Sequence, residues 1–85
     1  MNWALFLNTR IKKSVRRFPK KDRLRINEAL AEMEGSPYTG DLVKVESEDN
    51  LWRRRVGAYR IKFQVREKEK VVYVYEISRR TSKTY

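Results

Sequence analysis

The residues of this 85-residue chain that could do chemistry are arginines and a tyrosine in its second half. Arg60 stands in an alternating segment, Arg79 follows a second such segment, and Tyr85 comes six positions later. Arginine matches phosphate oxygens with two hydrogen bonds and stays charged at physiological pH. Tyrosine, with an ordinary pKa of about 10, is a weak base, but nearby cations favour its phenolate. These residue types suit attack of a ribose 2′-hydroxyl on its own phosphate.

Each of these residues also has a plainer interpretation. Arg60 fits a solvated strand arginine, Arg79 and Arg80 fit a basic tail, and Tyr85 fits a chain end. Tyrosine can also stack on a nucleobase, which is a binding role rather than a catalytic one. From pattern alone, both a slow histidine-free nuclease and a binding surface stay open.

Other chemistries are limited by what the composition lacks. The chain has no cysteine and no histidine, which excludes disulfides, thiolate chemistry and histidine-based acid–base catalysis, and disfavours a transition-metal site. We therefore expect no metal and no cofactor. No run of about 18 apolar residues is present, so we expect no contact with a membrane and a cytoplasmic location.

The charge is large and segregated. The net charge is +10: residues 10–25 carry nine basic and one acidic side chain, residues 26–50 one and seven, and residues 51–85 eleven and three. Such a field attracts polyanions, so nucleic acid is the leading partner class, with a merely solubilising surface as the alternative.

The elements that must position these residues can be read from periodicity. Residues 3–7 have strand composition, 10–18 and 20–34 show apolar stripes of helical spacing around Pro19, and 51–56, 59–66 and 71–77 alternate as strands. Asn8 or Thr9 is expected to cap the first helix, and Gly35 to end the second in a left-handed conformation. Residues 42–45 fit either a short strand or a packed loop.

These elements predict one domain over residues 1–85. We expect an α+β fold in which an antiparallel sheet of about four strands packs against an N-terminal helical hairpin, in the order β-α-α-β-β-β. The segment 71–77 is apolar on both faces and should lie inside the sheet. The side chains predicted to form the sheet core are Tyr59, Ile61, Phe63, Val65, Tyr73, Tyr75 and Ile77.

The second half resembles a known family. Residues 51–61, LWRRRVGAYRI, are similar to the W-x-x-R-V-G-x-Y-R-hydrophobic block of the RelE/ParE superfamily of type II toxin–antitoxin toxins. The apolar strand 71–77 and the ending RRTSKTY match its RelE-like mRNA endonuclease branch. The element order agrees over the whole chain, so the resemblance implies a RelE-like fold.

The resemblance also implies roles for individual residues. Arg60 falls on the arginine that contacts the scissile phosphate, Arg79 on the arginine implicated in transition-state stabilisation or leaving-group protonation, and Tyr85 on the tyrosine proposed to activate the 2′-hydroxyl or to stack. Where some relatives carry two lysines, this chain has Leu51 and Arg53. The residues expected to contact RNA are Arg53, Arg55, Lys62, Arg80 and Lys83.

The implied function is that of a toxin cleaving mRNA in the ribosomal A site, without a metal. The implied partners are mRNA, the ribosome and a cognate acidic antitoxin that forms a hetero-oligomer with the toxin. Two alternatives stay open: a ParE-like poison of DNA gyrase without nuclease activity, and a non-catalytic basic nucleic-acid-binding module.

Overall fold

The architecture is a sheet backed by helices. The computed structural model describes residues 3–45 and 50–79, and these form five strands and two helices. In chain order they are β1 (Ala4–Leu7), α1 (Thr9–Arg16), α2 (Lys20–Gly35), β2 (Asp41–Lys44), β3 (Leu51–Val56), β4 (Tyr59–Arg66) and β5 (Val71–Arg79). No helix in the described ranges is long and apolar enough to cross a membrane.

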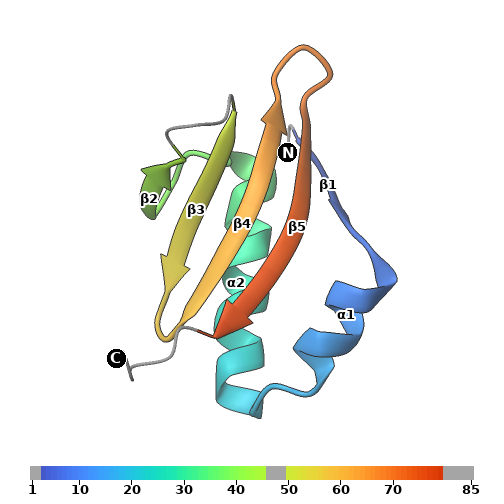
Figure 1. Ribbon diagram of the computed structural model, residues 1–85, viewed down its shortest axis with the longest axis vertical. Helices are drawn as coiled ribbons and strands as arrows, with labels where there is room; N and C mark the ends of the chain where they lie inside the picture. Colours follow the sequence, from blue (N-terminus) through green and yellow to red (C-terminus); the bar gives the residue numbers. More distant parts are fainter. Residues whose placement is uncertain (1–2, 46–49, 80–85) are drawn as a thin grey trace.

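The strands are ordered β1-β5-β4-β3-β2. β2 to β5 form an antiparallel meander, and β1 adds to its edge by pairing in parallel with β5. In Figure 1 the sheet faces the viewer, with α2 behind it and α1 beside β1 and β5. The α+β class and the joining of β1 to the later strands are confirmed. The sheet has one strand more than predicted, because the ambiguous segment 42–45 pairs with β3 as β2. It is also mixed rather than antiparallel throughout, because β1 pairs with β5 in parallel.

The helices follow the local signals of the sequence with one exception. Asn8 caps α1, its side-chain oxygen accepting a hydrogen bond from the Ile11 N–H at 2.8 Å. Pro19 precedes α2, where its fixed φ suits a helix entry. The left-handed ending predicted at Gly35 is wrong: α2 includes Gly35, and the chain leaves through an extended Ser36, whose N–H donates to the Glu32 carbonyl.

The core lies between the sheet and the helices. On β4 the alternate side chains Ile61, Phe63 and Val65 have no exposed surface. They pack in one cluster with Ile26 and Met33 of α2, and Ile11 and Val15 of α1 close its margin. The core face predicted from the alternation along β4 is therefore correct. The even-numbered side chains of β4 lie on the opposite face of the sheet.

β5 departs from this alternation because of a bulge. Lys62 pairs with Glu76 whereas its neighbour Phe63 pairs with Val74, so the register between β4 and β5 skips Tyr75. Before the bulge Val72 and Val74 point inward, and after it Ile77 does. Tyr73 and Tyr75 were predicted to be core residues, but they are 42% and 44% exposed on the open face. A strict period of two cannot show an inserted residue, which explains the error.

One buried arginine ties the sheet to α2. Arg54, on the helix-facing side of β3, donates to the Ala29 carbonyl at 3.3 Å and pairs with Glu32. Gly40 lies against it with φ +86°, and a Cβ at that position would come within 2.5 Å of Arg54 Nε. Glycine is required there both for the left-handed backbone and for the close approach. Arg54 is thus a structural residue, although the charged triplet 53–55 looks uniform in the sequence.

Candidate functional site

Cations face one another across the open side of β3 and β4. The strand register places Arg55 opposite Arg60, and Arg53 opposite Lys62. Like charges directly opposite each other destabilise an antiparallel pair. Two consecutive pairs of like charge therefore lower the stability of the sheet at this point. Residues that lower stability in this way are often found at functional sites.

Carboxylates neutralise only part of this charge. Asp41 of β2 pairs with Arg55 at 3.0 Å, and Glu76 of β5 pairs with Lys62 at 3.3 Å. Within residues 3–45 and 50–79, neither Arg53 nor Arg60 takes part in an ion pair. The Nε of Arg53 is buried and has no hydrogen-bond partner in the described chain. These two arginines therefore carry charge that no carboxylate of the described residues neutralises.

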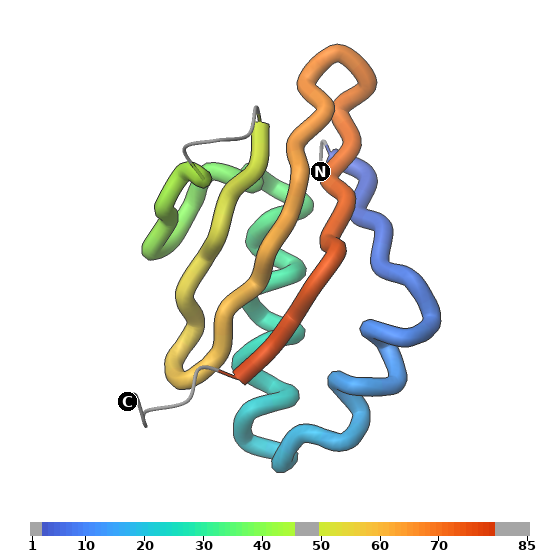
Figure 2. The backbone as a smooth tube through the Cα atoms, in the orientation of Figure 1, coloured from blue at the N-terminus to red at the C-terminus, as the bar shows by residue number. Residues whose placement is uncertain are grey.

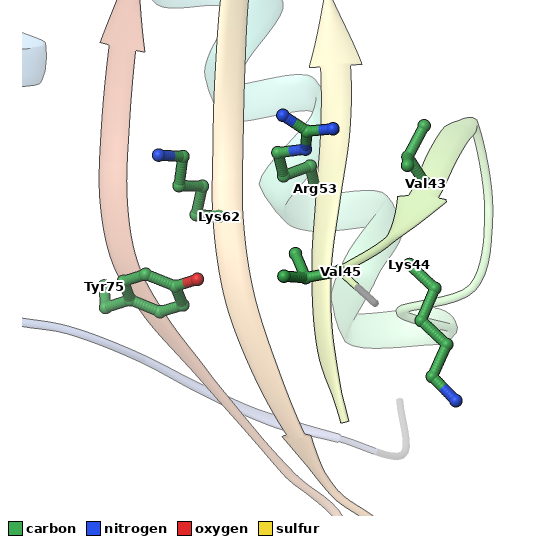
Figure 3. A pocket seen from close by; sticks show the side chains of 6 residues that line it. All are labelled: Val43, Lys44, Val45, Arg53, Lys62 and Tyr75. Atoms are coloured by element: carbon green, nitrogen blue, oxygen red, sulfur yellow. The ribbon is translucent and has the colours of Figure 1, made fainter. Parts of the chain in front are cut away.

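Two shallow hollows in the open face lie against these cations. One, of about 190 Å³, is lined by Arg53, Arg55 and Arg60 together with Asp41 and Val43. The other, of about 400 Å³, lies around Arg53 and Lys62 and extends to Tyr75. Figure 3 shows that Arg53, Lys62 and Tyr75 reach this second hollow from three different strands, with Val43 and Val45 at its side. The smaller hollow is of a size that suits a phosphate group between three guanidinium groups.

Arg79 lies on the other side of the sheet from Arg60. It pairs in register with Tyr59, and its guanidinium carbon is 5.9 Å from the centre of the Tyr59 ring. The Tyr59 ring is buried against Phe18, and its hydroxyl donates to Asp22 at 3.0 Å. The roles that the resemblance implies require Arg60 and Arg79 to act together on one phosphate. The structure instead places them on adjacent strands but opposite faces, because they are paired with Ser78 and Tyr59 respectively.

Two tyrosines are poorly suited to act as bases. Burial, aided by the hydrogen bond to Asp22 and its charge, raises the pKa of Tyr59, and Arg79 opposes this rise only weakly. Burial and the carboxylate of Glu67, which accepts the Tyr38 hydroxyl at 2.5 Å, raise the pKa of Tyr38 to about 12. A phenol with a raised pKa holds its proton more firmly and does not accept one.

Part of the predicted site lies outside the described residues. Tyr85, Arg80 and Lys83 belong to the segment 80–85, so their roles stay predictions. Figure 2 follows the described chain to the end of β5, near the turn between β3 and β4. Leu51 pairs with Gln64 and is half-buried, and its apolar side chain brings no charge to this part of β3.

Some residues of the open face were not found from the sequence. Val43 and Val45 line the hollows because β2 extends the meander, which the sequence left undecided. Tyr75 was assigned to the core because the bulge in β5 has no signature in the hydrophobic pattern. Within residues 3–45 and 50–79, no group of acidic side chains could hold a metal ion.

The chain resembles solved RelE structures. The sequence matches no family model, and no curated protein matches it. RelE of the archaeal RelE–RelB complex from Pyrococcus horikoshii superimposes with a TM-score of 0.84 at 25% identity, over 98% of this chain and 100% of that one. The isolated Escherichia coli RelE toxin superimposes with a TM-score of 0.80 at 20% identity, over 95% of this chain and 87% of that one. A chain of the RelBE2 toxin–antitoxin complex of Mycobacterium tuberculosis superimposes with a TM-score of 0.77 at 12% identity, over 94% of this chain and 100% of that one. The RelE-like fold predicted from the sequence is confirmed.

Proposed function

We propose that this chain is the toxin of a type II toxin–antitoxin pair and that it is an endoribonuclease acting on mRNA. The observation that carries the proposal is the hollow on the open face where Arg53, Arg55 and Arg60 meet. It is supported by the RelE-like fold, which is that of toxins solved alone and with RelB antitoxins. Cationic side chains fixed around a phosphate stabilise the charge that builds up on it during transfer.

The reaction assigned to this surface is attack of a ribose 2′-hydroxyl on the adjacent phosphate. Arg60 binds the oxygens of the phosphate that is attacked. Arg53 and Arg55 bind the neighbouring phosphates of the RNA. Arg79, at the end of β5, and Tyr85, six residues further along, act on the leaving oxygen and on the 2′-hydroxyl. Because Arg60 and Arg79 lie on opposite faces, the scissile phosphate must sit near the end of β5, where an RNA strand can pass from the open face to Arg79.

The described residues form no compact set of acid, base and nucleophile. The chain thus depends on a partner that holds the RNA in a reactive geometry, since orientation supplies much of the rate in such reactions. The ribosomal A site, with mRNA threaded through it, is the partner we assign. A cognate acidic antitoxin would neutralise the same cations and block the hollow.

The test is induced expression in cells, with mapping of mRNA 5′ ends. Wild type should arrest growth and produce cuts in register with codons, whereas Arg60→Ala and Tyr85→Ala should lose both. The matched control is Arg17→Ala, which removes one exposed arginine at the end of α1, remote from the open face. Growth arrest with intact mRNA would contradict the nuclease and favour a gyrase poison. No arrest at all would favour a binding module.

A further inference from the structure

The open face carries aromatic side chains beside its cations. Phe6 of β1 is 50% exposed and Tyr73 of β5 is 42% exposed. They are paired in register, and their rings stack with centres 5.4 Å apart and planes inclined by 23°. Tyr75, two residues further along β5 and 44% exposed, borders the hollow that also contains Arg53 and Lys62. The aromatic row runs along β1 and β5, and the cation row along β3 and β4.

This arrangement leaves a large part of each ring exposed to solvent, although Phe6 and Tyr73 also stack on each other. Exposed aromatic side chains gain less from the hydrophobic effect than buried ones do. Tyr73 and Tyr75 share the outer face by ordinary strand alternation, and the bulge that follows turns Ile77 inward. Arg66 adds a cation 5.7 Å from the centre of the Tyr73 ring. Rings and guanidinium groups presented side by side on an open sheet are the two components that bind single-stranded RNA: rings stack on bases and cations contact phosphates.

We propose that Phe6, Tyr73 and Tyr75 form a base-stacking platform for single-stranded RNA, with the backbone of the same strand held by Arg53, Arg60 and Lys62. The inference rests on the proposed function for the identity of the nucleic acid, and it extends the site from a phosphate hollow to a track across the whole sheet. Single-stranded RNA is the ligand that fits both parts of this surface. Its phosphates complement the charge of the flanking cations, and its bases offer flat faces on which the rings can stack.

Binding to an RNA that cannot be cleaved tests the platform separately from catalysis. The probe is a fluorescent single-stranded octaribonucleotide with 2′-O-methyl groups, which have no hydroxyl to attack the phosphate. Anisotropy titration should show Phe6→Leu and Tyr73→Leu binding about 5- to 100-fold more weakly than wild type. Both substitutions keep an apolar side chain at the position and remove the aromatic ring, together with the hydroxyl in the case of Tyr73. Inorganic polyphosphate, which has charge but no bases, should bind these variants as well as it binds wild type.

The matched control is Tyr38→Leu. Tyr38 is 40% exposed, comparable with Tyr73, but its ring contacts Trp3 and Trp52, away from the open face. This variant should bind the octamer like wild type, and thermal unfolding of all variants checks that they are folded. Arg53→Gln should weaken both the octamer and polyphosphate and reduce the slope of log affinity against log salt by about one.

The outcomes separate the two proposals. Unchanged octamer affinity in Phe6→Leu and Tyr73→Leu would overturn the platform and leave the nuclease untouched. Equal losses for octamer and polyphosphate, equal affinity for duplex and single-stranded RNA, or dimerisation of the wild type through this face in sedimentation would also overturn it. Loss of octamer binding in both ring variants, together with intact mRNA in cells expressing wild type, would uphold the platform and refute the nuclease.

Discussion

The two sides of β4 follow opposite rules. On the helix side Ile61, Phe63 and Val65 are fully buried in one cluster. On the other side Arg60 and Lys62 stand directly opposite two further cations. One strand thus supplies the centre of the core and the centre of the candidate site, and the alternation of residues keeps them apart. Stability and function are separated by the sheet itself, so substitutions at neighbouring positions should have effects of different kinds.

The sharpest test of this separation compares Phe63 with Gln64. Phe63→Ala should cost about 3–5 kcal/mol of unfolding free energy, because it empties the middle of the core. That is most of the stability of a domain this small. Gln64→Ala, on the open face, should stay within about 0.5 kcal/mol. Urea unfolding followed by circular dichroism measures both, and losses of similar size would refute the division.

The adjacent arginines of β3 provide a second comparison. Arg54→Met removes the hydrogen bonds to the Ala29 carbonyl and Glu32, and should cost about 1–3 kcal/mol even though the Nε of Arg54 lacks a partner in the described chain. Arg53→Met removes a buried nitrogen that lacks a partner in the described chain, and should raise stability by up to about 1 kcal/mol. The same Arg53 variant should bind RNA more weakly. If Arg53→Met destabilises the fold as much as Arg54→Met does, Arg53 is structural.

Tyr59 tests how Arg79 is held on the helix side. Tyr59→Phe removes the hydrogen bond to Asp22 and should cost about 1 kcal/mol. The ring beneath Arg79 remains, so growth arrest on induced expression should persist. Asp22→Asn serves as a control for the charge of the acceptor. Loss of toxicity in Tyr59→Phe with little change in stability would mean that the hydroxyl itself acts in the reaction.

The smallest expected effect is a pH dependence from Tyr38. Its pKa rises to about 12 in the folded protein, whereas a tyrosine in the unfolded chain ionises at about 10. The stabilisation is therefore complete below pH 10 and is lost as the pH rises from about 10 towards 12. Unfolding measured across this range should show a shallower decline in Tyr38→Phe than in wild type. Identical declines would mean that the contact with Glu67 does not persist in solution.

How well the sequence predicted these features depended on how local the cause was. Periodicity on β4 and the cap at Asn8 are local, and both predictions were correct. The bulge at Tyr75 depends on pairing between strands, and the opposite faces of Arg60 and Arg79 depend on register. Neither is encoded in the hydrophobic pattern of a single strand. The distinction between Arg53 and Arg54 was also out of reach, because it arises from which side of β3 meets α2.

The parallel pairing of β1 with β5 bears on the order of folding. Every other strand pair in the described sheet joins neighbours along the chain, whereas β1 joins residue 4 to residue 71. Such distant contacts form late, because the entropy of closing the loop must be overcome first. Phe6 reaches Tyr73 only through this step. During synthesis, then, the chain cannot assemble its aromatic row until β5 has been made, so the face proposed to bind RNA stays incomplete up to that point.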